Sequence, residues 1–91
     1  MNNNKFILRF TRTALKSLKT IPANSAKLII SNLEKLAEDP YSMINVKKLT
    51  NYGVSYRLRV GKYRVLYEIE KDNQISIILI VDILDRKDAY K

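Results

Sequence analysis

The spacing of apolar residues divides the first half of the chain into a strand and two helices. In residues 5–10 the bulkiest apolar side chains recur at every second position, which predicts a strand. The next segment has apolar residues at helical spacing, with Thr11 as a suitable N-cap and Pro22 as its end. Residues 23–40 carry one long apolar stripe, which predicts an amphipathic helix that stops at the closing Asp-Pro pair.

The second half of the chain is interpreted as a loop followed by three strands. Residues 41–52 show no clear period and are predicted as the loop. Strands are predicted over 56–60 and 63–70, and residues 71–73 form a turn signal. The run "QISIILIVDIL" at 74–84 is apolar at nearly every position, which is typical of a strand that is buried on both faces near the middle of a sheet.

This order of elements indicates one fold class. Two helices joined by a short break form an antiparallel hairpin, and such a hairpin can cover one face of a sheet. We therefore predict an α+β fold, in which a two-helix hairpin packs on a mostly antiparallel four-stranded sheet. The 91 residues are enough for a single domain, so residues 1–91 are predicted to form one.

A short turn fixes the pairing of the two middle strands. Only Gly61 and Lys62 separate them, and glycine at the first central position suits a two-residue type II′ turn. That turn places Arg59 opposite Arg64 and puts Arg57 on the same face, turned away from the helices. The face turned toward the helices is then formed by Tyr56, Leu58, Val60, Tyr63, Val65 and Tyr67.

The grouped arginines indicate an anion-binding site. Like charges placed directly opposite each other destabilise a sheet by up to about 1 kcal/mol, and a bound anion reverses the sign of that effect. Guanidinium groups match phosphate oxygens two at a time. The alternative is that Arg57 or Arg59 pairs with Glu68 or Glu70 on the same sheet. Other basic residues could converge on this face: Lys47, Lys48, Lys62, Arg86 and Lys87.

Composition agrees with a polyanionic partner. Seventeen Lys and Arg against nine Asp and Glu give a net charge of +8, which attracts RNA, DNA, acidic proteins or anionic membranes. The absence of Cys and His excludes disulfides and the usual zinc sites, and it suits the reducing cytoplasm, where we expect the protein. No signal peptide is expected, and the longest apolar run, 77–81, is too short to span a bilayer.

The sequence also resembles a known family. The element order, the "VKKLTN" loop, the "YRLRVGKYRVLYEI" hairpin and the terminal "RKDAYK" resemble the RelE/ParE superfamily of bacterial toxins. The resemblance implies that the chain either cleaves mRNA in the ribosomal decoding site, as the RelE branch does, or inhibits DNA gyrase, as the ParE branch does. It also implies a cognate antitoxin as partner, operator DNA bound only by the toxin–antitoxin complex, no membrane partner, no cofactor and no metal.

The resemblance to the cleaving branch, which we favour, implies specific site residues. Its two basic residues before the turn correspond to Arg57 and Arg59, and its arginine after the turn corresponds to Arg64. Its C-terminal arginine and tyrosine correspond to Arg86 and Tyr90. RNA contacts are expected from the lysines around them: Lys47, Lys48, Lys62 and Lys87.

Two departures from the cleaving branch bear on mechanism. This chain has arginines where the best-studied members have lysines on the first hairpin strand, and Asp85 where many relatives have histidine. Metal-free cleavage uses the RNA 2′-hydroxyl as nucleophile and needs a base, an acid and positive charge. Arginine supplies charge but does not act as a base. The remaining candidates, each weak at neutral pH, are Lys62, Glu68, Asp85 and Tyr90.

The sequence therefore predicts a slow endoribonuclease that depends on the ribosome to orient its substrate. Two alternatives stay open at this point. The chain could be a gyrase inhibitor of the ParE type, or a catalytically weak homologue that acts mainly in antitoxin binding and promoter autoregulation.

Overall fold

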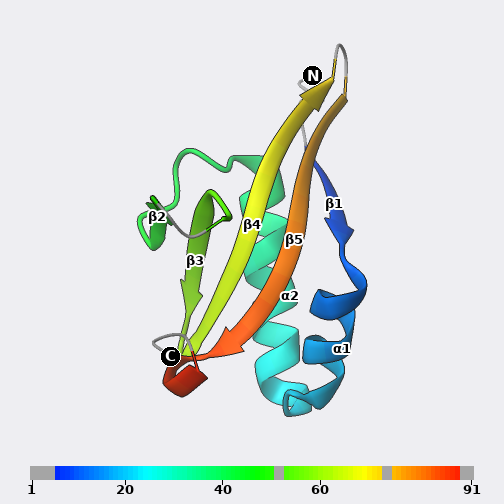
Figure 1. Cartoon of the computed structure of the whole chain (residues 1–91), viewed down its shortest axis with the longest axis vertical. Coiled ribbons are helices and arrows are strands. Elements are labelled where there is room, and N and C mark those ends of the chain that lie inside the picture. The colour runs from blue at the N-terminus through cyan, green and yellow to red at the C-terminus, as the bar shows by residue number, and fades with distance from the viewer. Residues whose placement is uncertain (1–5, 51–52, 73–74, 89–91) are drawn as a thin grey trace.

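Two helices cover one face of a twisted sheet (Figure 1). The computed structural model describes residues 6–50, 53–72 and 75–88. In chain order these residues form β1 (Ile7–Phe10), α1 (Arg12–Thr20), α2 (Ala23–Glu38), β2 (Val46–Lys48), β3 (Tyr56–Val60), β4 (Tyr63–Asp72), β5 (Ile75–Asp85) and the 3-10 helix η1 (Arg86–Asp88). Neither α1 nor α2 has the length and hydrophobicity of a membrane-spanning helix.

The sheet confirms the predicted α+β class but has one strand more than expected. Its strand order is β1-β5-β4-β3-β2, in which β1 runs parallel to β5 and the other neighbours are antiparallel. The additional strand is β2, which lies inside the predicted loop 41–52 and pairs with β3. Three residues are too few to show a period, so the sequence pattern alone could not reveal this strand.

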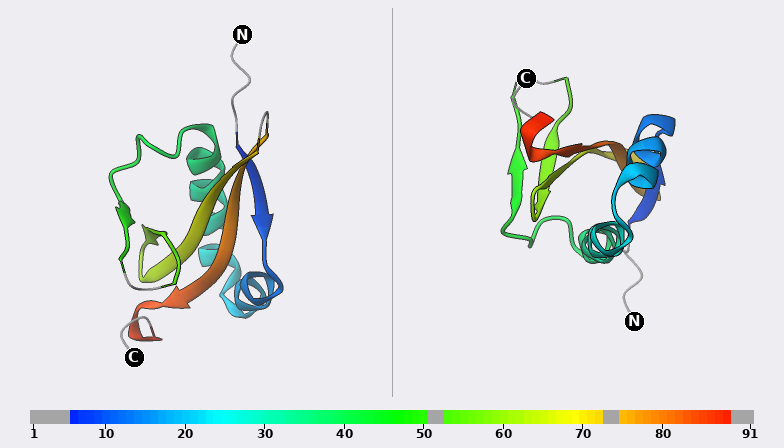
Figure 2. Two further views of the ribbon diagram at one scale, coloured as in Figure 1. Left: turned by 45° about the horizontal axis from the view of Figure 1, so that its top comes forward. Right: turned by 90° about the horizontal axis from the view of Figure 1, so that it is seen from below.

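The helices lie against one face of the sheet (Figure 2), and the hydrophobic core fills the space between them. From α2, Ile29, Leu33 and Leu36 are fully buried. The side chains predicted to face the helices are buried as well, apart from Tyr56, which is partly buried against the core. The hydrophobic effect therefore fixes which face of the β3–β4 hairpin turns inward and which remains available for binding.

Strand β5 is buried on one face only, which corrects the prediction of burial on both. It lies inside the sheet between β1 and β4, and Ile78 and Ile80 are fully buried under the helices. On the other face, Ile77 and Leu79 are only half-buried, and Ile75 is 49% exposed. The reason is that both helices pack on the same side of the sheet. We call the uncovered side the open face.

Helix α1 is anchored to β5 by its predicted cap. The hydroxyl of Thr11 accepts a hydrogen bond from the backbone N–H of Ala14 at 3.0 Å and donates one to the carbonyl of Val81 at 2.6 Å. Further along α1, the hydroxyl of Ser17 donates to the carboxylate of Asp82 at 2.8 Å. These bonds hold the end of β5, where the pairing with β4 shifts between Leu66 and Tyr67, and so position the C-terminal turn.

Tyr67 gives a stability prediction, because its hydroxyl group is buried. The side chain is fully buried and stacks on Tyr56, and its hydroxyl has no hydrogen-bond partner among the residues described. An unsatisfied buried hydroxyl costs about 1–3 kcal/mol. Tyr67→Phe is therefore expected to leave the free energy of unfolding at neutral pH unchanged or higher, as measured by urea denaturation.

The same substitution is expected to change the response to alkali. Burial, and next the neighbouring Tyr56, raise the pKa of Tyr67 above its ordinary value. The neutral form is then favoured in the folded state, so this contribution is complete below the unfolded pKa of about 10 and is lost as the pH rises above it. Above that pH, the free energy of unfolding of Tyr67→Phe should fall less than that of wild type. The control Tyr41→Phe, at an exposed position, should lose as much as wild type does. Lower stability of Tyr67→Phe at pH 7 would contradict the first expectation.

Candidate functional site

The β3–β4 hairpin brings the arginines together in the predicted register. Gly61 has a φ angle of +59°, which a residue without Cβ adopts readily at the start of a tight turn. Arg59 pairs with Arg64, and Arg57 pairs with Leu66. Because paired residues share a face, Arg57, Arg59 and Arg64 belong to the open face, as predicted.

Strand β2 extends this group to the edge of the sheet. Lys47 pairs with Arg57 and therefore shares the open face. Lys48 pairs with Tyr56 and, by strand alternation, belongs to the other face. The expectation that both lysines join the arginines is thus met by Lys47 alone. We call the resulting set the cationic row: Lys47, Arg57, Arg59 and Arg64.

Burial increases along the cationic row from the edge of the sheet to its centre. Lys47 and Arg59 are exposed, Arg57 is half-buried, and Arg64 is only 3% exposed. Arginine is the cation best suited to such a position, because its guanidinium group is not deprotonated in proteins. The row therefore combines a positive charge held within the sheet with accessible charges beside it, an arrangement that attracts an anion to this surface.

Within the described ranges, no carboxylate pairs with the two arginines of β3. In the part of the chain that the structure describes, neither Arg57 nor Arg59 forms an ion pair, and Nε of Arg57 is buried without a hydrogen-bond partner. The carboxylate of Glu68 instead accepts a hydrogen bond from the backbone N–H of Ser55 at 3.0 Å. Glu70 lies further along β4, opposite Ile77. The alternative in which these acids pair with Arg57 or Arg59 is therefore wrong for the described residues.

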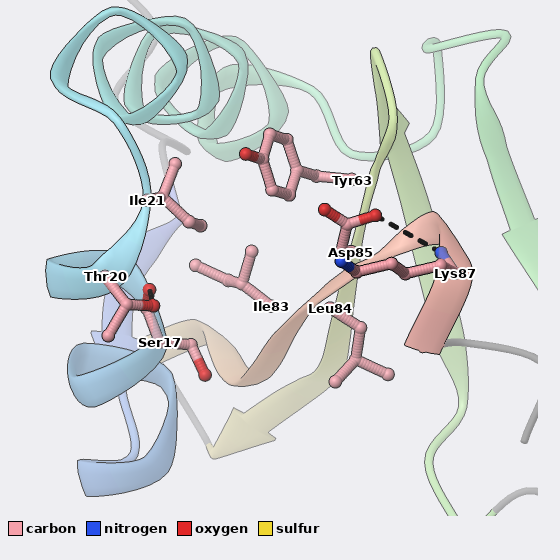
Figure 3. A pocket seen from close by; sticks show the side chains of 8 residues that line it. All are labelled: Ser17, Thr20, Ile21, Tyr63, Ile83, Leu84, Asp85 and Lys87. Atoms are coloured by element: carbon pink, nitrogen blue, oxygen red, sulfur yellow. Dashed lines mark hydrogen bonds between the residues drawn. The ribbon is translucent and has the colours of Figure 1, made fainter.

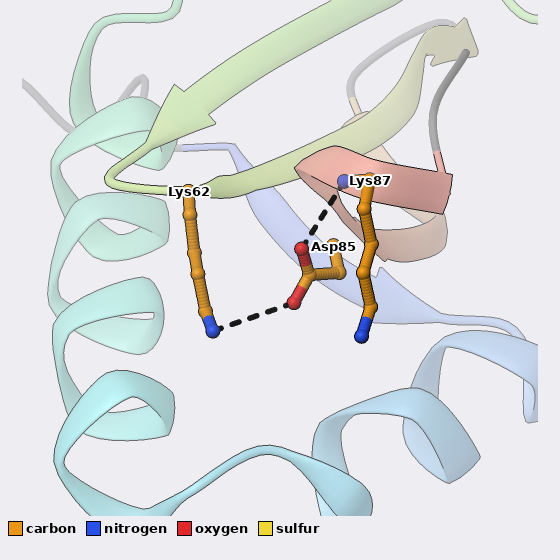
Figure 4. A network of polar contacts seen from close by, with 3 residues as sticks. All are labelled: Lys62, Asp85 and Lys87. Atoms are coloured by element: carbon orange, nitrogen blue, oxygen red, sulfur yellow. Dashed lines mark hydrogen bonds and ion pairs between the residues drawn. The ribbon is translucent and has the colours of Figure 1, made fainter.

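Asp85 joins the C-terminal turn to the hairpin turn (Figure 4). Its carboxylate lies 3.5 Å from Nζ of Lys62 and accepts a hydrogen bond from the backbone N–H of Lys87 at 3.2 Å. That N–H group and the charge of Lys62 lower the pKa of Asp85, so this carboxylate is a poorer base than an ordinary aspartate. The backbone N–H of Arg86 also donates to the carbonyl of Lys62 at 2.6 Å, which keeps Arg86 beside the hairpin.

The Asp85 network borders a pocket between α1 and the end of β5 (Figure 3). The pocket has a volume of about 310 Å³, and its lining residues are Ser17, Thr20, Ile21, Tyr63, Ile83, Leu84, Asp85 and Lys87. Asp85 pairs with Tyr63 and so belongs to the helix side of the sheet. Lys62 and Lys87 thus flank Asp85 at this end, apart from the cationic row, and Tyr90 lies outside the described residues.

A groove beside the cationic row contains residues that sequence reasoning missed. It has a volume of about 480 Å³ and is lined by Ile44, Asn45, Val46, Lys47, Arg57 and Arg59. Ile44 and Asn45 were missed because residues 41–52 were predicted as an undifferentiated loop. The available signal was weak: a single isoleucine in a stretch of mixed apolar and polar residues, three residues before Lys47. Across the described residues, no three His, Cys, Asp or Glu side chains cluster as metal ligands would.

Comparisons with known proteins give a consistent result. Residues 8–90 match the family model described as ParE toxin of the type II toxin–antitoxin system parDE. The chain is 34% identical over 89 residues to the putative toxin RelE1 of Methanocaldococcus jannaschii, a match that covers 96% of this chain and 97% of that protein.

Two of the solved structures with a similar fold are toxin–antitoxin complexes. One is the complex RelBE2 of Mycobacterium tuberculosis, with a TM-score of 0.74, 26% identity and coverage of 90% of this chain and 99% of that chain. Another is the RelB–RelE complex of Methanococcus jannaschii, with a TM-score of 0.68, 30% identity and coverage of 90% and 94%.

Proposed function

From the premise that this chain belongs to the RelE/ParE superfamily, as a toxin of a type II toxin–antitoxin system, we propose that it is a ribosome-dependent mRNA endoribonuclease. The observation that carries the proposal is the cationic row on the open face, where Arg59 and Arg64 lie directly opposite each other. A gyrase inhibitor has no need of such a phosphate-binding set. The similarity of this chain to proteins named RelE also favours the cleaving branch.

The proposed reaction is an attack by the RNA 2′-hydroxyl on the adjacent phosphorus. The new O–P bond forms as the bond to the leaving 5′-oxygen breaks, which gives a 2′,3′-cyclic phosphate and a free 5′-hydroxyl. Negative charge accumulates on the phosphoryl oxygens in the transition state, and the proposal assigns its stabilisation to Arg57, Arg59 and Arg64, which share the open face. Arg86, held beside the same hairpin, would contribute further positive charge.

Proton transfer is the weaker part of this mechanism. Glu68 is engaged by the backbone of Ser55, and the lowered pKa of Asp85 makes it a poor base. Charge stabilisation and orientation by the ribosome must then provide most of the rate enhancement. We therefore propose that the cleavage step is slow. The role of Tyr90, as a stacking residue or through its hydroxyl group, stays a prediction.

The proposed partners follow from the same premise. Both solved relatives described above are toxin–antitoxin complexes, which supports a cognate antitoxin for this chain. The net charge of +8 favours an antitoxin with acidic segments. We further propose that toxin and antitoxin bind operator DNA only together, and that the toxin acts on ribosomes in the cytoplasm.

One observation favours a second candidate function. The family model that matches residues 8–90 is described as a ParE toxin, and the ParE branch inhibits DNA gyrase. The alternative is therefore a gyrase inhibitor, in which the cationic row contacts a protein or DNA surface. A catalytically weak homologue that serves antitoxin binding and promoter control remains the third reading.

Expression of the chain without an antitoxin separates these functions. Incorporation of labelled methionine is expected to stop before incorporation of labelled thymidine. Purified protein added to ribosomes carrying a defined mRNA should produce a cut in the decoding-site codon with a 2′,3′-cyclic phosphate end. If DNA synthesis stops first and purified gyrase loses supercoiling activity, the gyrase reading is correct and the nuclease proposal is wrong.

A further inference from the structure

The groove between β2 and β3 combines cationic side chains with an exposed apolar wall. Lys47, Arg57 and Arg59 line it, and none of its described lining residues is acidic. Ile44 also lines the groove and is 100% exposed, the highest exposure of any large apolar side chain in the described ranges. A ligand that covers this isoleucine removes apolar surface from water, which favours binding.

Hydrogen bonds fix the backbone next to Ile44 relative to the arginine strand. The side-chain Nδ2 of Asn45 donates to the carbonyl of Arg59 at 2.6 Å, and the backbone N–H of Arg59 donates to the carbonyl of Asn45 at 3.0 Å. Ile44 is the residue directly before Asn45. The backbone at this point of the groove is thus held in place, which lowers the cost of ordering it when a ligand contacts both Ile44 and Arg59.

We infer that this groove seats one nucleotide of a single-stranded RNA next to the scissile phosphate, with backbone phosphates on Arg57 and Arg59 and the face of the base against Ile44. The inference rests on the proposed function, since it takes RNA as the substrate. Single-stranded RNA offers unstacked bases with apolar faces, and its phosphates alternate with those bases along the chain.

The mixture of cationic and apolar residues in the groove favours RNA over an acidic protein segment. Two guanidinium groups and one ammonium group line the groove beside two aliphatic residues, Ile44 and Val46, of which Ile44 is the exposed one. Phosphates accept bidentate hydrogen bonds from guanidinium groups, and each nucleotide supplies one phosphate with one base. An acidic peptide would cover the same surface, and the experiment below includes it as an outcome that overturns the inference.

Equilibrium binding of a short 2′-O-methyl RNA tests the inference, because this probe cannot be cleaved by 2′-hydroxyl attack. At low salt, Ile44→Ala is expected to weaken binding about 5-fold, through the loss of apolar contact area. Ile44→Phe is expected to tighten binding about 3-fold, because aromatic rings stack better on bases. Improved binding cannot arise from a folding defect. Leu28→Ala, at an exposed position on α2, serves as the matched control and should bind as wild type does.

A probe with the same backbone and abasic sugars separates contact with the base from contact with phosphate. Both Ile44 variants should bind the abasic probe as wild type does, while Arg59→Ala should weaken binding to both probes. If Arg59→Ala weakens binding and the Ile44 variants do not, the inference is wrong while the proposed function stands. If wild type binds neither probe, the inference fails, while cleavage on ribosomes decides the proposed function separately. If Ile44→Ala weakens binding of the antitoxin but not of RNA, the groove is a protein contact and the inference is overturned.

Discussion

Replacing Arg59 with alanine is expected to lower the rate of mRNA cleavage on the order of 100-fold, because one preorganised donor to the transition-state charge is lost. The side chain is exposed, so its removal leaves no cavity in the core. It also relieves the repulsion from Arg64, its direct partner across the hairpin. The melting temperature should therefore stay constant or rise slightly. Single-turnover cleavage on programmed ribosomes and a thermal melt of the same preparation measure both effects.

A matched arginine elsewhere on the surface controls for net charge. Arg12→Ala removes the same charge from the exposed start of α1, away from the open face, and is expected to cleave at the wild-type rate. If Arg59→Ala and Arg12→Ala reduce cleavage equally, the effect comes from total charge and not from the cationic row. If Arg59→Ala lowers stability and keeps full activity, Arg59 is a structural residue.

The pairing of the hairpin was predictable because a short turn leaves little freedom. Two residues between two strands allow one register, and a period of two then assigns every side chain to a face. That reasoning predicted that Arg59 lies opposite Arg64, and it predicted which side chains of the hairpin face the helices. It required no knowledge of distant parts of the chain, which is why it succeeded from sequence alone.

The remaining features depend on contacts between distant residues, which a local pattern does not encode. Strand β2 has only three residues and owes its existence to pairing with β3. The run in β5 is apolar on both faces, but whether a second face is covered depends on where the helices pack. The hydrogen bond from the backbone N–H of Ser55 to Glu68 likewise joins β4 to the loop before β3. Sequence reasoning therefore kept Glu68 as a candidate base.

The burial of Arg64 also gives a physical reason for arginine at this position. A lysine placed in the same low-dielectric position loses its proton more readily, because desolvation lowers its pKa. Arginine avoids that loss and offers two parallel hydrogen bonds to phosphate. The preference for arginine over lysine at the centre of the row is thus consistent with a site that must stay charged within the sheet.

Substitution of Arg64 gives the second large expected effect. Because Arg64 is buried, its test needs a different choice of variants from the test of the exposed Arg59. Arg64→Ala should reduce both activity and stability, since it removes a side chain that is 3% exposed. Arg64→Met preserves most of the volume and removes the charge together with the hydrogen-bonding groups of the guanidinium. It is expected to melt within a few degrees of wild type and to cleave on the order of 100-fold more slowly. Wild-type activity in Arg64→Met would show that Arg64 only fills space.

The variant Arg64→Lys tests the charge itself, through the dependence of cleavage on pH. The introduced ammonium group is buried, so its pKa should fall and its charge should be lost as the pH rises. Activity relative to wild type is then expected to be lowest in mild alkali and to recover as the pH falls, whereas Arg64→Met should show no such recovery. The measurement is the ratio of variant to wild-type single-turnover rates across the pH range in which both proteins stay folded. A constant ratio for Arg64→Lys would mean that the charge at this position is not what the reaction requires.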